Sequence, residues 1–180
     1  NTKTKETIGN CVYPYWHPTG DYVVYSVNKT IQVFHAIQDE RVEVIDLASD
    51  IVVYHPESKK VITSELLETD DFETFPSFSP DGKTLYFSSS AFQKIPGDYK
   101  EIRYNLCAIA FDPETMTFGD HVDTLVNAAA MGKSISYARP SPDGKHIMFT
   151  LSDYGNFSIW HKEADLWLYN LKDGSLREMK

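Results

Sequence analysis

Apolar and polar residues alternate in short segments along the chain, and turn-forming residues separate the segments. The segment TFPSF at 74–78 leads into the turn sequence SPDG, and KTLYFSSS follows at 83–90. Alternation over a few residues between turn signals is typical of β-strands. The pattern predicts two antiparallel strands joined by a short hairpin. Pro80 suits the start of a type I turn, Asp81 tolerates the next position, and Gly82 takes the left-handed one.

This hairpin pattern occurs three times, and corresponding residues are 62 positions apart. A fixed period of this length indicates a repeat architecture. We interpret the recurring turn positions, with the serines beside them, as structural rather than catalytic. They are Pro18, Gly20, Pro80, Asp81, Gly82, Pro142, Asp143 and Gly144. Aromatic residues share the same period at Tyr13, Phe75 and Tyr137, and again at Tyr25, Phe87 and Phe149.

Two more strands follow each hairpin. The third strands read DIVVYHP at 50–56, NLCAIAFDP at 105–113 and DLWLYNL at 165–171. The fourth strands read KVITSELL at 60–67, TFGDHVDTLV at 117–126 and SLREMK at 175–180. The segment LVNAAAMG forms at most one or two helical turns. Tandem four-stranded units predict an all-β chain of β-propeller blades, at about 11–71, 72–133 and 134–180.

The repeated motif P-x-F-S-P-D-G-K-x-[LI]-x-F-[ST], followed by [DN]-[IL]-x-x-[YI], resembles the TolB-like β-propeller repeat, a relative of WD-type repeats. The resemblance extends over nearly the whole chain. The first copy departs from it, since HPTGD places His17 at the serine position and Thr19 at the aspartate position. Propellers have roughly four or more blades. We therefore expect further blades, from a longer parent chain or from a second copy.

Charge and composition limit the classes of partner and ligand that this chain is expected to bind. The net charge of −9 disfavours nucleic acid or an anionic membrane surface, and no apolar run approaches the roughly 20 residues that span a membrane. Cys11 and Cys107 form no CxxC pair, which argues against a cysteine zinc site. We expect both to be buried free thiols. The segment NAAAMGKS at 127–134 differs from a phosphate-binding loop because Asn127 replaces its first glycine and no helix pattern follows.

The links between second and third strands are long and varied, and they span 28–49, 90–104 and 153–164. Loops of this kind on a rigid scaffold are where binding usually occurs, and all three should gather on one face of a propeller. The candidate binding residues are Phe34, His35, Tyr99, Arg103, Tyr104, Tyr154, Phe157, Trp160 and His161. Local packing is the alternative interpretation of the same residues. Metal binding by His35 and His161 lacks a third ligand, and no metal or cofactor is expected.

The other histidines, His17, His55, His121 and His146, fall at or near turns, so we expect ordinary surface residues there. The resemblance implies a non-catalytic interaction module of the periplasm or cell envelope, which docks a protein or peptide. The alternative is the propeller of a prolyl-oligopeptidase-type peptidase or of a metal-dependent sugar lyase, with the catalytic parts largely outside this chain. Glycan binding through Tyr99, Tyr104, Tyr154 and Trp160 is a third hypothesis.

Overall fold

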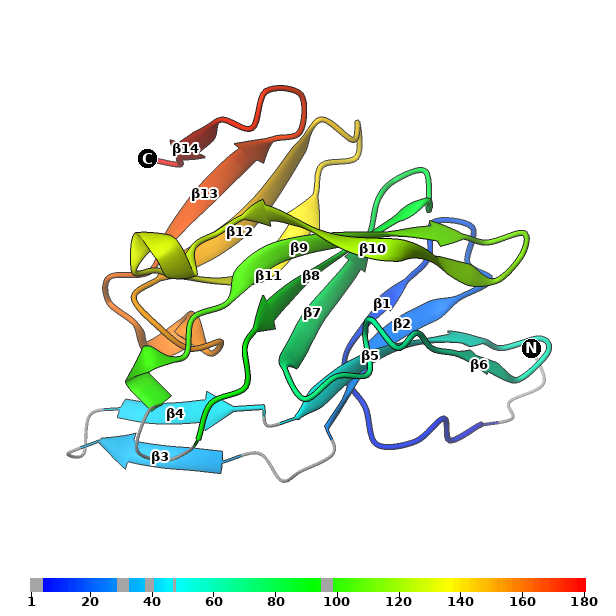
Figure 1. Cartoon of the computed structure of the whole chain (residues 1–180), viewed down its shortest axis with the longest axis horizontal. Helices are drawn as coiled ribbons and strands as arrows, with labels where there is room; N and C mark the ends of the chain where they lie inside the picture. The colour runs from blue at the N-terminus through cyan, green and yellow to red at the C-terminus, as the bar shows by residue number, and fades with distance from the viewer. Residues whose placement is uncertain (1–4, 29–32, 38–40, 47, 95–98) are drawn as a thin grey trace.

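The computed structural model describes residues 5–28, 33–37, 41–46, 48–94 and 99–180. These residues form three four-stranded antiparallel sheets and a separate two-stranded hairpin (Figure 1). The first sheet contains β1 (Val12–Trp16), β2 (Val23–Asn28), β5 (Ser49–His55) and β6 (Lys60–Ile62). The second contains β7 (Phe72–Phe78), β8 (Thr84–Ser90), β9 (Asn105–Asp112) and β10 (Thr117–Val126). The third contains β11 (Ser134–Pro140), β12 (His146–Ser152), β13 (Asp165–Asn170) and β14 (Leu176–Glu178).

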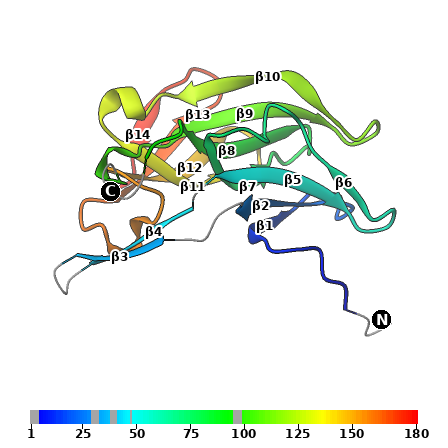
Figure 2. The ribbon, with the colours of Figure 1, turned by 60° about the horizontal axis from the view of Figure 1, so that its bottom comes forward.

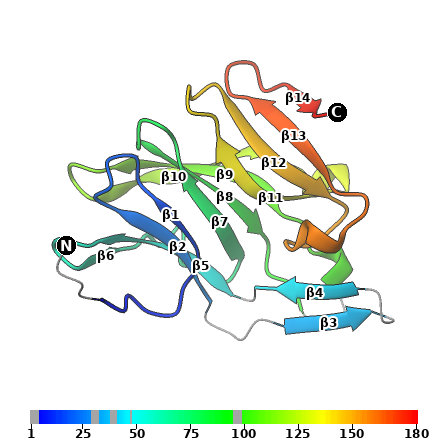
Figure 3. The ribbon, with the colours of Figure 1, turned by 180° about the vertical axis from the view of Figure 1, so that it is seen from behind.

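The predicted fold class is confirmed, because the three sheets are arranged as successive blades of a β-propeller. Within each sheet the strands follow chain order from one edge to the other. The first strands of the blades, β1, β7 and β11, lie next to one another, as seen from behind in Figure 3. The hairpin of β3 (Val33–Ile37) and β4 (Arg41–Ile45) is inserted between β2 and β5. No helix in the described part of the chain is long and apolar enough to span a membrane.

Adjacent blades are held together by apolar side chains from both faces of the middle sheet. On β8, Leu85 and Phe87 belong to the core shared with the first blade, whereas Tyr86 belongs to the core shared with the third. Successive side chains of a strand point to opposite faces, so one strand supplies both cores. Complete burial of a leucine or phenylalanine side chain stabilises the fold by about 1.5–3 kcal/mol. Blade-to-blade packing therefore makes a large contribution to the stability of the described residues.

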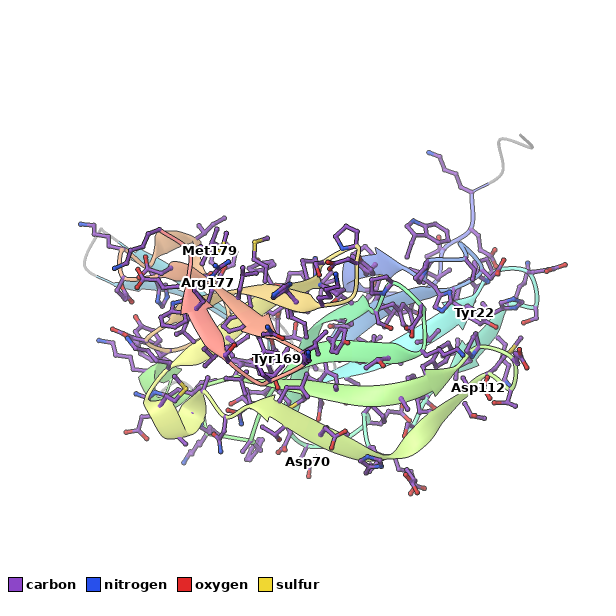
Figure 4. All side chains as sticks on the ribbon, turned by 90° about the horizontal axis from the view of Figure 1, so that it is seen from above. Tyr22, Asp70, Asp112, Tyr169, Arg177 and Met179 are labelled. Carbon is purple, nitrogen blue, oxygen red and sulfur yellow. The ribbon has the colours of Figure 1, made fainter. Side chains whose placement is uncertain are left out.

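The two outer faces of this arrangement differ. On the first blade, residues 5–11 lie against the outer face: the hydroxyl of Tyr54 donates to Glu6 at 2.9 Å, and that of Tyr25 to the Ile8 carbonyl at 3.4 Å. On the third blade, Leu166 is 47% exposed, although the corresponding Ile51 of the first blade is completely buried. Figure 4 shows Tyr169 on the side of the third sheet that faces the second, and Arg177 and Met179 on the opposite side.

Each innermost strand contains a bulge at the same position. The pairing register shifts between Val12 and Tyr15 in β1, and equivalent shifts occur in β7 and β11. Tyr13, Phe75 and Tyr137 lie in these bulges with φ of 55°, 53° and 56°. This left-handed region is rare for aromatic residues. The bulges turn the three rings toward one another, with ring centroids of Phe75 4.3 Å from Tyr13 and 4.2 Å from Tyr137.

The SPDG turns owe their shape to a repeated hydrogen-bond pattern. The Ser79 hydroxyl donates to Asp81 at 2.6 Å and accepts from the Thr84 amide at 3.0 Å. The third blade repeats both bonds with its own SPDG sequence. The glycines adopt the expected left-handed conformation, with φ of 73° at Gly82 and 68° at Gly144.

His17 corrects the expectation of a surface histidine, because its side chain is buried. Its Nδ1 accepts from the Thr19 amide at 3.3 Å, which leaves the proton on Nε2. Nε2 then donates to the carbonyl oxygen of Gly82 in the next blade, at 3.0 Å. His17 thus bonds to the residue two positions further on, as the turn serines do, and also ties two blades together. The other three histidines, His55, His121 and His146, are partly or fully exposed.

The two cysteines are both free thiols, as expected. Cys107 is buried on β9. Cys11 is only partly buried, so the expectation of a second buried thiol was wrong. Cys11 precedes β1 and packs against the apolar residues on the outer face of the first blade. Among the described residues, no further sheet covers this face.

We predict that Gly82→Ala destabilises the chain much more than Gly20→Ala. Both glycines have positive φ, so an alanine at either position costs about 1 kcal/mol or more in backbone strain. Only at Gly82 would the new Cβ overlap the His17 ring, 2.1 Å from Nε2. Overpacking of this kind costs a further ~1–3 kcal/mol. Urea unfolding of both variants measures the difference. Equal losses of stability would contradict the close contact between His17 and Gly82.

Candidate functional site

The three long links gather at one end of the molecule, as the sequence predicted. Figure 2 shows the β3–β4 hairpin beside the short 3-10 helices η1 (Tyr99–Glu101) and η3 (Ser158–Trp160) at this end. The Gly155 amide donates to the Ile102 carbonyl at 2.7 Å, which joins the third link to the second. The side-chain amide of Asn156 donates to the Asp46 carboxylate at 3.0 Å, which joins the third link to the first. We call this end of the molecule the link face.

Asp46 is a buried acidic residue of the link face. It follows β4, and its side chain is completely buried. It accepts hydrogen bonds from the side-chain amide of Asn156 and from the Tyr13 hydroxyl. Burial, and then the charge of Asp46, raise the pKa of Tyr13. Asp46 therefore connects the first link to the aromatic cluster of the innermost strands.

Glu73 is a second buried carboxylate, on the innermost strand of the second blade. Its pKa is raised to about 7, mainly by burial and to a smaller extent by the nearby charges of Asp50 and Asp71. A hydrogen bond from the Thr69 hydroxyl to Oε1, at 2.6 Å, acts in the opposite direction. Its other oxygen, Oε2, has no hydrogen-bond partner in the described structure. Close to neutral pH this side chain is thus balanced between its neutral and charged forms.

Tyr104 is completely buried between these carboxylates and does not form part of an exposed surface. Burial raises its pKa, and Asp46, Tyr13 and Glu73 add to the effect. Its hydroxyl has no hydrogen-bond partner among the described groups. Tyr104 was predicted as a binding residue and as a glycan-stacking ring. Its burial favours the packing interpretation and leaves no ring face for a sugar.

His161, Tyr154 and Tyr99 pack against one another on the second and third links. His161 is buried, with Nδ1 3.1 Å from Glu163 and its ring 4.7 Å from that of Tyr154. Tyr154 is also buried, and its ring lies 6.3 Å from that of Tyr99. The structure therefore brings three of the predicted residues into one cluster, whose local packing is what the alternative interpretation predicted.

The remaining candidates are less informative. Arg103 and Phe157 are partly exposed, and Arg103 donates to the Glu101 carbonyl at 3.4 Å. The side chains of Phe34, His35 and Trp160 lie outside what the structure describes. Within the described residues, no group of three or more His, Cys, Asp or Glu side chains is placed to hold a metal ion.

Sequence reasoning missed Asp46, Glu73 and Asn156. Asp46 and Asn156 lie at link positions that no repeated motif marks, and Glu73 precedes the repeated motif. One usable signal was the 62-residue period of Tyr13, Phe75 and Tyr137. It showed that the same aromatic position recurs in each blade, although it did not show that the three rings meet.

Comparison with known proteins supports the fold. No protein-family model matches the chain, and no curated protein matches it. Among solved structures, a protein described as TolB from Agrobacterium tumefaciens is similar over 97% of this chain, with 17% identity and a TM-score of 0.57. Prolyl oligopeptidase B from Galerina marginata is similar over 92% of this chain, with 13% identity and a TM-score of 0.51.

This chain spans 50% of the length of the TolB structure and 20% of that of the oligopeptidase. At such identities the likeness establishes the architecture alone. Together with the three sheets, it defines the class of the protein: the chain is a three-blade segment of a β-propeller. The same propeller architecture occurs in an enzyme and in a protein described as TolB, so the activity of this chain has to be argued from its own residues.

We predict that wild-type stability falls between about pH 4.5 and 7, whereas Glu73→Gln removes much of this fall. The pKa of Glu73 is raised on folding, so the native state holds this proton more tightly than the unfolded state. Its stabilising effect is present below the unfolded pKa and is lost as pH rises through the folded value of about 7. As the pH rises across this range, the free energy of unfolding of the glutamine variant should increase relative to that of wild type by on the order of 3 kcal/mol.

Urea unfolding at a series of pH values measures this difference. Thr69→Ala is the matched second variant, since it removes the hydrogen bond that lowers the pKa of Glu73. In that variant the fall in stability should extend to higher pH. If the difference in free energy of unfolding between wild type and Glu73→Gln does not change with pH, the raised pKa of Glu73 is contradicted.

Proposed function

We propose that this chain is a non-catalytic binding module that docks a protein or peptide partner on its link face. The observation that carries the proposal is the convergence of the links over buried carboxylates, with large apolar side chains exposed beside them. Phe92 on the second link is 63% exposed, and Ile159 on the third is 71% exposed. Exposed apolar side chains on a rigid scaffold provide the kind of contact that partners bury at an interface.

Hydrogen bonds and ring contacts hold Phe92 and the helix that carries Ile159 in place. The Phe92 amide donates to Asp71 at 2.9 Å, and its ring makes an edge contact with buried Phe72 at 6.1 Å. Ile159 lies in η3, next to Ser158, whose hydroxyl pairs with Ser136 at 3.2 Å. Both apolar groups are thus held in position before binding, which lowers the entropy lost on association. The net charge of −9 favours a basic partner.

Completion of the ring belongs to the same proposal. The exposed face of the third blade corresponds to the face that the first and second blades bury against their neighbours. A further blade, from the parent chain or from a second copy, would cover Leu166 and Met148 there. We also propose a periplasmic or cell-envelope location, for which the similarity to a protein described as TolB is the support.

A second candidate function is the propeller domain of a peptidase, which the similarity to prolyl oligopeptidase B favours. In that case the hydrolase would lie outside these residues. A GxSxG nucleophile motif in the same parent protein, together with peptide hydrolysis by that protein, would support this candidate. A parent protein that binds peptides without cleaving them would favour the binding module.

We predict that a random peptide library selected on this chain yields peptides that depend on Phe92 and Ile159. The double variant Phe92→Ser/Ile159→Ser should weaken their binding at least tenfold, because buried apolar anchors carry much of the binding free energy. Trp16→Ser is the matched control: Trp16 is 60% exposed but lies at the opposite end of β1, beside the first turn. Peptides that respond to the Trp16 change and not to the double variant would contradict the link face.

A further inference from the structure

The opposite end of the propeller carries a pocket between the turns of the second and third blades. Its volume is about 450 Å³, and Ser79, Asp81, Thr84, Tyr86, Asp143 and Gly144 are among the residues that line it. All of them lie in or beside the two SPDG turns. The repeat allows a direct comparison with the corresponding position between the first and second blades.

Between the first and second blades, two aromatic side chains occupy this position. His17 and Tyr22 are both buried, with ring centroids 5.2 Å apart. The His17 ring lies directly against Gly82 and donates to its carbonyl oxygen at 3.0 Å. The Tyr22 hydroxyl donates to the Pro113 carbonyl at 2.6 Å. The first blade thus fills its own notch with a flat N–H donor and a second ring.

The 62-residue repeat places Ser79 at the position of His17 and Thr84 at that of Tyr22. Both replacements are smaller, and the pocket is the space they leave. Gly144 corresponds to Gly82, and a Cβ at Gly144 would meet only Pro80, at 4.0 Å, instead of an imidazole ring. In the described structure no second-blade side chain takes up the role of His17 toward the Gly144 carbonyl.

The rim of the pocket is acidic. Hydrogen bonds from Ser79 and from the Lys83 amide lower the pKa of Asp81, and those from Ser141 and the Lys145 amide lower that of Asp143. Both carboxylates are therefore ionised at neutral pH. Asp143 has an exposed ion pair with Lys145 at 3.5 Å, which solvent screens strongly. Asp81 uses Oδ1 for both of its hydrogen bonds inside the turn.

We propose that this pocket binds a flat cationic N–H donor, namely an imidazolium or guanidinium group presented by a partner. One N–H donates to the Gly144 carbonyl, as His17 does to Gly82 in the first notch. A second N–H donates to Asp81 Oδ2 at the rim. Tyr86, which is buried in the core shared with the third blade, bounds one side of the pocket. This site is separate from the link face, so it does not depend on the function proposed there.

Nuclear magnetic resonance of the full ¹⁵N-labelled chain tests the proposal, with imidazole and methylguanidinium as probes. Imidazole should shift the amide signals of Ser79, Asp81 and Gly144 saturably, and it should bind more tightly at pH 6 than at pH 8. The reason is that imidazole gains its charge in this range, whereas a guanidinium stays charged. Methylguanidinium should accordingly bind equally at both pH values. Shifts that do not saturate, or that spread over the surface, would overturn the proposal.

The matched variant carries the side chains of the first-blade turn at the corresponding positions of the second blade. The triple change Ser79→His, Asp81→Thr and Thr84→Tyr should fill the pocket from within and abolish the imidazole shifts. Persistence of the shifts in the folded triple variant would overturn the proposal. Asp81→Asn tests it independently, because asparagine keeps an oxygen for the turn while removing the charge. It should weaken methylguanidinium binding about threefold to tenfold, and unchanged affinity would count against the cation site.

Discussion

The contact among three aromatic rings at the innermost strands is the interaction on which the rest of the structure depends. Each ring belongs to a residue with positive φ, a conformation that costs on the order of 1–3 kcal/mol when the residue is not glycine. The contacts of Phe75 with Tyr13 and Tyr137 offset part of this cost, since aromatic pairs contribute about 0.5–1.5 kcal/mol beyond their burial. The bulges therefore persist because three blades are present together.

The same contact organises the link face. The hydroxyl of Tyr13, a member of the aromatic cluster, donates a hydrogen bond to Asp46. Asp46 also accepts one from the side-chain amide of Asn156 on the third link. A hydrogen-bonded connection thus runs from the innermost strands to two links that are far apart in the sequence. The buried carboxylates below the links keep their positions because the scaffold is rigid. In the function proposed above, the exposed side chains over them make the contact with the partner.

Much of the fold was predictable from the sequence, because strand alternation and turn residues are local signals. The 62-residue period identified the blades, and Gly82 and Gly144 adopt the conformation that their turns require. His17 shows where local reasoning ends. Its place in a turn indicated a surface residue, but the Gly82 carbonyl it binds is 65 residues away, in the next blade. Tyr104 and Glu73 likewise depend on burial that only the packed blades create.

The central claim is that three blades meet through Tyr13, Phe75 and Tyr137. The most direct test is to measure nuclear Overhauser effects between the ring protons of Phe75 and those of the two tyrosines in a selectively labelled chain. Ring centroids 4.3 and 4.2 Å apart predict strong effects from Phe75 to both tyrosines. Their absence in the folded chain would contradict the arrangement of the blades, and with it the positions of Asp46 and the link face.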